Sequence, residues 1–247
     1  FLKCARNTHD PAEATLFLDD IIDSGATRDR YKTLYPKTPF VALVDKFEPR
    51  IQGEPVNVWY QFPWEVETGP EDAVIRLLEH IGEDPRREGL LETPKRVVKA
   101  LKEMTEGYSQ KPEEILSKVF TVEYDELVLL QNIRFSSTCE HHILPFVGTA
   151  AVAYVPDGKV VGISKLARLV ECYARRLQIQ EQMTQQIGNA IMKYLQPKGV
   201  GVIITASHQC MGCRGVRQPD ASMTTSCLLG CMREEASARA ELMSLLK

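Results

Sequence analysis

The sequence predicts an α+β fold for most of this chain. Segments with helical periodicity alternate with pairs of short apolar segments that have strand periodicity, and no regular β-α-β repeat connects them. Hydrophobic residues make up 44% of the 247 residues, which is enough for a substantial core. The formal net charge of −3 argues against disorder and against a general basic surface for nucleic acid.

The chain contains no segment that predicts a membrane or secreted protein. No apolar run approaches the ~20 residues that a membrane helix needs, and no charged leader followed by an apolar core opens the sequence. Seven cysteines, an odd number spread over a long chain, favour reduced thiols over a disulfide framework. We therefore expect a cytoplasmic protein with neither a membrane nor a nucleic-acid partner.

Two compositional regions meet near the Thr68-Gly69-Pro70 segment. All of the net negative charge and both tryptophans lie in residues 1–68, whereas all but one of the seven cysteines follow residue 138. We predict a partial domain over residues 1–68 and a complete domain over residues 69–247.

The second region opens with two predicted helices. The first begins at Pro70, because proline suits a first helical turn, and its apolar residues recur at helical spacing to Ile81. The second is predicted to have Thr93 as its N-cap, followed by Pro94 and an apolar stripe to Met104.

Strand signals follow from residue 120, with alternation over 120–124 and an apolar run over 127–130. Residues 150–155 and 160–163 predict a hairpin around the turn at Pro156-Asp157-Gly158. Ser164 is predicted to cap a helix, and helical spacing continues to Tyr194. A strand over 200–206, a Thr/Ser-rich strand near 222–228 and a closing helix near 233–246 complete the layout.

Two clusters of cysteine and histidine suggest a metal site. Cys139-Glu140-His141-His142 holds a thiol and an imidazole three residues apart, and His208-Gln209-Cys210 would place two donors on one face of a strand. Thiolate and imidazole together favour zinc among the common divalent metals. Ordinary buried thiols and surface histidines are the alternative, which this clustering makes less favourable.

The number of ligands is left open by the sequence. Cys139, His142, Cys210 and Cys213 could close a structural site, whereas three ligands would leave a position for a water whose pKa zinc lowers to about 7. The presence of His141 and His208, titratable groups beside the predicted ligands, favours the open, catalytic site.

Several motifs together resemble GTP cyclohydrolase I, from about residue 70 to the C-terminus. They are Cys139-Glu140-His141-His142, Gly162-Ile163-Ser164-Lys165-Leu166-Ala167-Arg168, Gln178-Ile179-Gln180-Glu181, and His208-Gln209-Cys210-Met211 with Arg214-Gly215. The resemblance implies the tunnelling fold and a toroidal homodecamer with active sites at subunit boundaries. It also implies that GTP is opened at C8, formate is released, and the product is 7,8-dihydroneopterin triphosphate.

The same resemblance implies a role for each matching residue. Zinc would be held by Cys139, His142 and Cys210. His141 and His208 would handle protons, with His208 protonating N7. Glu181 and Gln180 would both be catalytic residues, with Gln180 beside the Glu181 carboxylate that accepts the guanine N1 and N2 donors and rejects adenine. The triphosphate would be bound by Ser164, Lys165, Arg168, Arg214, Arg96 and Lys99.

Two positions depart from the family pattern. Gln182 stands where an arginine is usual, so a cation is lost beside the predicted guanine-binding acid, and we expect altered packing or affinity. Cys213 lies where the family varies, so the resemblance implies that it is a bystander, and the closed structural site is kept as an alternative.

The first region resembles the second half of a xanthine-guanine type I phosphoribosyltransferase. An apolar strand, two acids and a small-residue loop before a helix would hold a phosphoribosyl group and Mg²⁺ through Asp19, Asp20, Asp23, Ser24, Gly25 and Thr27. Lys46 and Trp59 would meet the purine, and Ala26 replaces a frequent glycine. Because the strands that normally precede this loop are absent, we expect no transferase activity from these residues alone.

Three functions remain as hypotheses from the sequence. The leading one is a zinc-dependent cyclohydrolase. The second is purine salvage by the first region, with the second region as an oligomeric scaffold carrying a structural zinc. The third is a GTP-binding module without catalysis.

Overall fold

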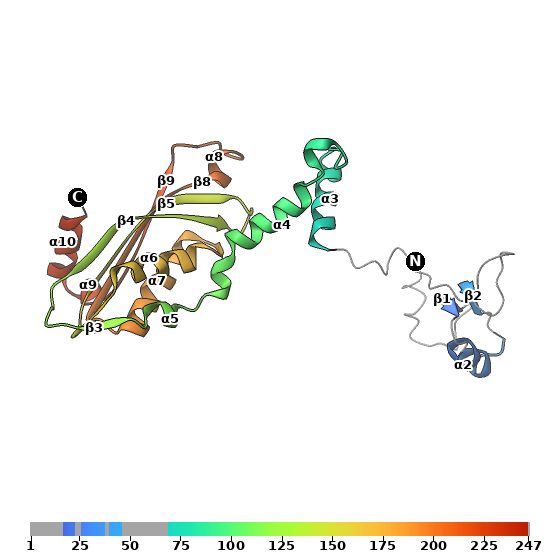
Figure 1. Cartoon of the computed structure of the whole chain (residues 1–247), viewed down its shortest axis with the longest axis horizontal. Helices are drawn as coiled ribbons and strands as arrows, with labels where there is room; N and C mark the ends of the chain where they lie inside the picture. Colours follow the sequence, from blue (N-terminus) through green and yellow to red (C-terminus); the bar gives the residue numbers. More distant parts are fainter. Residues whose placement is uncertain (1–16, 23–25, 38–39, 46–68, 247) are drawn as a thin grey trace. The chain divides into compact units, whose positions relative to one another are not determined.

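The computed structural model describes residues 17–22, 26–37, 40–45 and 69–246. The chain divides into two compact units, Phe1–Glu67 and Thr68–Lys247, and each is described by itself (Figure 1). Within the described ranges, no helix has the length and apolar character needed to cross a membrane.

The first unit contains two parallel strands joined through a helix. Strand β1 (Phe17–Ile22) pairs with β2 (Phe40–Asp45), and α2 (Ala26–Leu34) connects them. The apolar strand and the following helix predicted here are confirmed, and the two acids of the prediction lie inside β1.

The second unit begins with a pair of helices that project from its body (Figure 1). Helix α3 (Pro70–His80) packs against α4 (Thr93–Met104), with the short 3-10 helix η2 (Glu88–Leu90) between them. A second 3-10 helix, η3 (Glu106–Ser109), and α5 (Pro112–Leu116) lead to the sheet. Gly107 lies so close to the Cys172 and Arg175 carbonyls that a Cβ could not fit, and this contact anchors the connection.

The body is built on a five-stranded, mainly antiparallel sheet in the order β7-β4-β5-β8-β9. These strands are β4 (Val128–Cys139), β5 (Pro145–Val155), β7 (Leu177–Gln178), β8 (Gly199–His208) and β9 (Ser222–Gly230). A separate pair is formed by β3 (Val119–Thr121) and β6 (Lys159–Val161).

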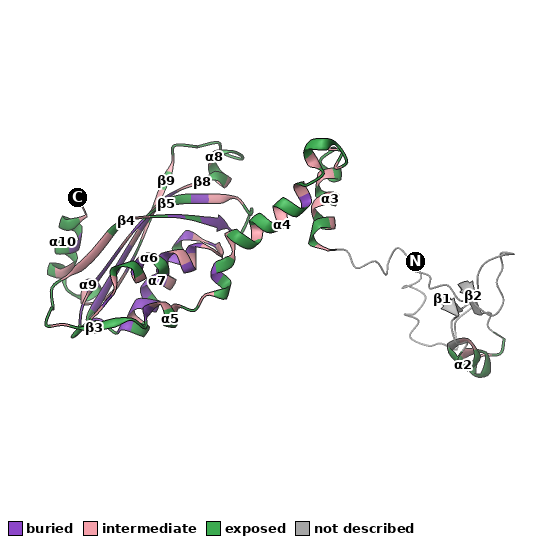
Figure 2. Cartoon of the chain, in the orientation of Figure 1, coloured by how far each residue is buried: buried purple, intermediate pink, exposed green. Residues whose placement is uncertain are grey.

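Helices cover the two faces of this sheet unequally. The long helices α6 (Ile163–Ala174) and α7 (Gln180–Leu195) pack over one face and bury the main core, shown in purple in Figure 2. The short α9 (Cys231–Glu234) and α10 (Ala236–Leu245) cover part of the other face with a smaller cluster around Ala153, Met232 and Leu242. The predicted α+β class is therefore confirmed for this unit.

The structure corrects several local predictions. Strands β4 and β5 extend well beyond the predicted apolar segments, because exposed polar residues such as Arg134, Ser136 and Thr149 lie beside buried ones and interrupt the apolar pattern. Thr93 and Ser164 lie inside the first turns of α4 and α6, whose N-caps are Glu92 and Gly162. Cys210 belongs to the short helix α8 (Gln209–Gly212) and not to a strand, because β8 ends at His208.

Candidate metal centre and active site

The sheet topology brings the two cysteine-histidine clusters together at one end of the sheet. Because β4, β5 and β8 are antiparallel neighbours, the end of β4 at Cys139, the start of β5 and the end of β8 share an edge. His208 is paired in register with Phe146 of β5. Residues about 65 positions apart in the sequence thus become spatial neighbours.

A tight turn after β4 presents the first cluster. The backbone N–H of Cys139 donates to the Leu144 carbonyl at 2.8 Å, and that of Ile143 donates to the Cys139 carbonyl at 2.9 Å. Ile143 has φ of 54°, a left-handed conformation that is costly for a β-branched residue. The turn directs both His141 and His142 back toward the Cys139 thiol.

Three donor atoms form a group suited to a metal ion. The ligand atoms of Cys139, His142 and Cys210 all lie within 4.8 Å of one another. Cys139 Sγ is 3.7 Å from His142 Nδ1, close to the separation of about 3.6 Å expected for sulfur and nitrogen on a tetrahedral zinc. Burial and the neighbouring Cys139 thiol raise the pKa of Cys210, while Arg214 lowers it. A bound cation would stabilise both thiolates, so the residues fit zinc.

Cys213 lies outside this group. It is exposed at the C-cap of α8, where its backbone N–H donates to the Gln209 carbonyl at 2.9 Å. Within the part of the chain that the structure describes, the donors that converge are three, so the closed four-ligand site receives no support.

Two further histidines lie beside the three donors. His141 Nδ1 is 3.9 Å from Cys139 Sγ, and the His208 ring stacks on Phe146 with centroids 4.7 Å apart and planes 8° apart. Partial burial lowers the pKa of His208, and the Glu181 carboxylate opposes this effect. Sequence analysis missed Phe146, because an aromatic residue at the start of a strand carries no signal until its cross-strand partner is known.

The predicted guanine-binding pair starts α7, but its two side chains have different surroundings. Glu181 is exposed in the first turn of α7, and its negative charge opposes the lowering of the His208 pKa. Gln180 is only 1% exposed, and its amide lies against β8 and β9. The structure therefore separates two residues that the sequence grouped as catalytic.

The predicted triphosphate contacts lie on three separate elements. Ser164, Lys165 and Arg168 are in the first two turns of α6, Arg214 follows α8, and Arg96 and Lys99 lie on the projecting α4. Lys99 is 3.8 Å from Glu103. The other four cations form no ion pair with any residue in the described ranges, so their charges are available to an anion.

Most of the phosphoribosyltransferase-like residues lie outside the described part of the chain. Asp23, Ser24, Gly25, Lys46 and Trp59 lie outside the described residues, as do the side chains of Asp19 and Asp20. Thr27 lies in the first turn of α2. Their proposed contacts, including those to Mg²⁺, therefore stay predictions.

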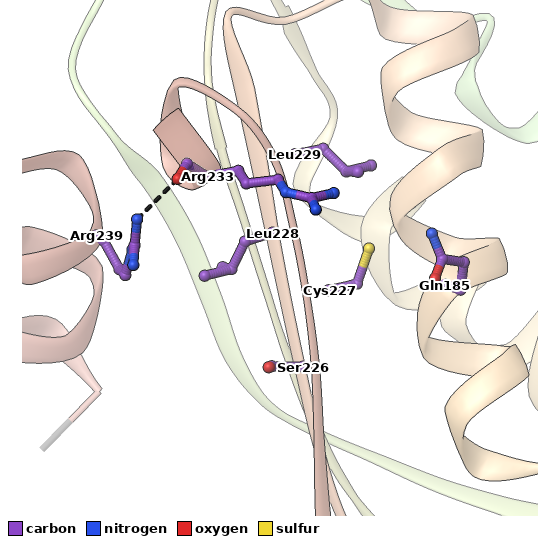
Figure 3. A pocket seen from close by; sticks show the side chains of 7 residues that line it. All are labelled: Gln185, Ser226, Cys227, Leu228, Leu229, Arg233 and Arg239. Atoms are coloured by element: carbon purple, nitrogen blue, oxygen red, sulfur yellow. Dashed lines mark hydrogen bonds between the residues drawn. The ribbon is translucent and has the colours of Figure 1, made fainter. Parts of the chain in front are cut away.

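A cavity of about 460 Å³ lies at the edge of β9, away from the metal group (Figure 3). Figure 3 shows the Cys227 thiol directed toward Gln185 of α7, whereas Arg233 belongs to α9 and its backbone carbonyl accepts from Arg239 at 2.7 Å. Nothing in the sequence patterns indicated this cavity.

Comparison with known proteins identifies the family of the second unit. The family model described as GTP cyclohydrolase I matches residues 70–247. The GTP cyclohydrolase 1 of Chlorobium phaeovibrioides is 54% identical over 188 residues, which cover 76% of this chain and 84% of that protein. That of Campylobacter curvus is 52% identical over 177 residues, covering 71% and 93%.

The chain belongs to the GTP cyclohydrolase I family. A third member, from Gloeobacter violaceus, is 54% identical over 71% of this chain and 82% of its own length. The apo archaeosine synthase QueF-Like superposes with a TM-score of 0.36 at 19% identity over 42% of this chain and 93% of that one, which is too distant to support an argument. None of these findings supports the phosphoribosyltransferase resemblance of residues 1–68.

Proposed function

We propose that the chain is a zinc-dependent enzyme that opens the imidazole ring of GTP at C8, releases formate and forms 7,8-dihydroneopterin triphosphate. The observation that carries this proposal is the convergence of Cys139, His142 and Cys210 within 4.8 Å beside two histidines that are not in the group. Zinc at this position would supply a Lewis acid that lowers the pKa of a bound water to about 7.

The histidines would move protons around C8. Burial lowers the pKa of His208, which favours its neutral form, and in that form it would accept a proton before passing one to N7. Stacking on Phe146 restrains the plane of the imidazole and thus the direction in which its nitrogens point. His141, beside the Cys139 thiol, would serve as the second proton carrier.

Glu181 and the unpaired cations would bind the substrate. Glu181 is exposed near His208, where its carboxylate could accept the guanine N1 and N2 donors, a pair that adenine lacks. Ser164, Lys165, Arg168 and Arg214 would bind the triphosphate, with Arg96 and Lys99 contributing further contacts. The proximity of Arg214 to Cys210 supports a triphosphate site that adjoins the metal group.

The tunnelling fold and a homodecamer are part of this proposal. Two observations support association between copies. The projecting helix pair α3–α4 exposes apolar side chains, including Leu77 at 64% and Ile81 at 72%. Arg96 and Lys99 lie on this projecting pair, so a neighbouring copy could use them to complete its own site. Sedimentation analysis of the purified chain would measure the number of subunits.

The decisive assay incubates zinc-loaded protein with GTP and measures formate and, after oxidation, a fluorescent pterin. We expect both products in equal amounts, and loss of both after chelation with recovery on adding Zn²⁺. An absence of formate from the zinc-loaded protein would refute the proposal, as would full activity in a His141→Ala variant.

A further inference from the structure

The side chain of Gln180 connects the start of α7 to two strands of the sheet. Its Nε2 donates to the Ile204 carbonyl of β8 at 3.0 Å and to the Met223 carbonyl of β9 at 3.0 Å. The same nitrogen is 3.1 Å from Thr225 Oγ1. An amide nitrogen has two hydrogens, so three acceptors around it fix its orientation closely.

A threonine pair extends this polar cluster. Thr184 Oγ1, one turn along α7, donates to the Gln180 carbonyl at 2.7 Å and lies 2.7 Å from Thr225 Oγ1. The cluster is buried between the helix and the sheet. Both the side chain and the backbone of Gln180 are therefore held, which fixes the rotation of the first turn of α7 about its axis.

This rotation decides where the next side chain points. Glu181 follows Gln180 directly and is exposed, so the two neighbouring side chains lie on opposite sides of the first turn of α7, one in the core and one in solvent. Ile204, which accepts from Gln180, lies four residues before His208 on the same strand. The amide thus ties the element that carries Glu181 to the strand that carries His208.

Packing alone does not account for an amide at this position. Gln180 Oε1 is buried and has no hydrogen-bond partner within the described chain, and a buried acceptor without a partner is destabilising. An apolar side chain of similar volume would avoid that penalty but would lack the directional bonds to β8 and β9. Only the amide can therefore fix the orientation of the first turn of α7 relative to β8 and β9.

We propose that Gln180 is a positioning residue that acts through Glu181, holding the first turn of α7 so that the Glu181 carboxylate points outward and can bind the guanine edge. This inference rests on the proposed function, because it assigns to Glu181 the recognition of the N1 and N2 donors. It changes the role of Gln180 from the predicted catalytic residue to a support of its neighbour.

The test compares GTP with inosine triphosphate, which lacks the N2 donor, in four proteins: wild type, Gln180→Met, Glu181→Gln and the double variant. We expect Gln180→Met to lower kcat/KM for GTP about 10–100-fold, the range for a hydrogen bond to a charged group. It should affect inosine triphosphate much less and leave zinc content unchanged. In the Glu181→Gln background, Gln180→Met should lower kcat/KM for GTP by less than about twofold, because the effects of two residues that act as a unit are not additive.

Gln178 offers a matched control. It is a glutamine only 2% exposed, and its Nε2 donates to the Tyr173 carbonyl and to Gln186 Oε1, both at 2.9 Å, with no bond to β8 or β9. Gln178→Met should destabilise the fold comparably but retain the wild-type preference for GTP. If Gln180→Met does not fold, Thr225→Val removes one of the three acceptors and should shift the preference in the same direction by a smaller factor.

Three results would overturn the proposal: an unchanged preference in the Gln180 and Thr225 variants, an equal loss of preference in Gln178→Met, or additive effects of Gln180→Met and Glu181→Gln. Each of these is distinct from failure of the proposed function, in which the wild-type protein itself releases no formate from GTP.

Discussion

The predicted metal ligands and the predicted triphosphate contacts are organised in different ways. The ligands are assembled within one chain, because adjacent antiparallel strands end at the same edge and a tight turn and a short helix complete the group. The cations lie on α6, after α8 and on the projecting α4, and their side chains are mostly exposed. Chemistry that needs sub-ångström precision thus rests on the sheet, while long-range charge attraction tolerates a looser arrangement.

The largest expected effect comes from removing one of the predicted metal ligands, which the sheet positions. Cys210→Ser should weaken zinc binding by more than the 10–100-fold typical of losing a group that only supports a ligand, and formate release should fall to background. Zinc content measured by mass spectrometry and the formate assay would report both losses.

Cys213→Ser is the control, because Cys213 is exposed and outside the donor group. It should keep full zinc content and activity. Loss of zinc from both variants would instead support a four-ligand structural site.

A smaller effect is expected from a group that adjoins the metal without binding it. His208→Ala should lower kcat by about 10²–10⁴-fold, the range for losing general acid-base catalysis, while zinc content stays at the wild-type level. Pre-steady-state measurement of formate release with saturating GTP would isolate this step. Loss of zinc from the variant would mean that His208 is a ligand.

The triphosphate contacts should respond mainly in substrate binding. Arg168→Ala removes a charge that has no acidic partner in the described part of the chain, and it should raise KM for GTP about 10–100-fold with a smaller change in kcat. Arg87 is the control, since its guanidinium is 2.6 Å from Glu83 and already neutralised. Arg87→Ala should leave KM unchanged, and an equal rise in both variants would mean that the effect is one of general surface charge.

The smallest effect concerns the turn that presents the histidines. Ile143→Asn replaces a β-branched residue at φ of 54° with one that adopts this conformation readily, and relief of strain should stabilise the metal-free protein by up to about 1 kcal/mol. Urea unfolding would measure the change. A decrease of the same size in the free energy of unfolding would show that the contacts of the Ile143 side chain stabilise the protein by more than the backbone strain destabilises it.

Much of the secondary structure and of the candidate site could be predicted from the sequence, because these predictions depend on residues that are close together in the chain. Pro70 marks the start of α3, helical spacing predicts α6 and α7, and the resemblance to GTP cyclohydrolase I implies Cys139, His142 and Cys210 as the group of donors. The helical position of Cys210 was not predicted, since a four-residue helix has too few residues to show a period.

The sequence by itself determined the α+β class, which follows from periodicity, and the family, which follows from the resemblance of several motifs in order. It also indicated which cysteine and histidine side chains could bind a metal, since that follows from their chemistry. Only the tertiary structure showed that three donors converge in the described part of the chain, that His208 stacks on Phe146, and that Gln180 faces the core while Glu181 faces outward. The physical reason is that strand register and helix rotation are set by packing between elements far apart in the chain. No local pattern encodes such packing.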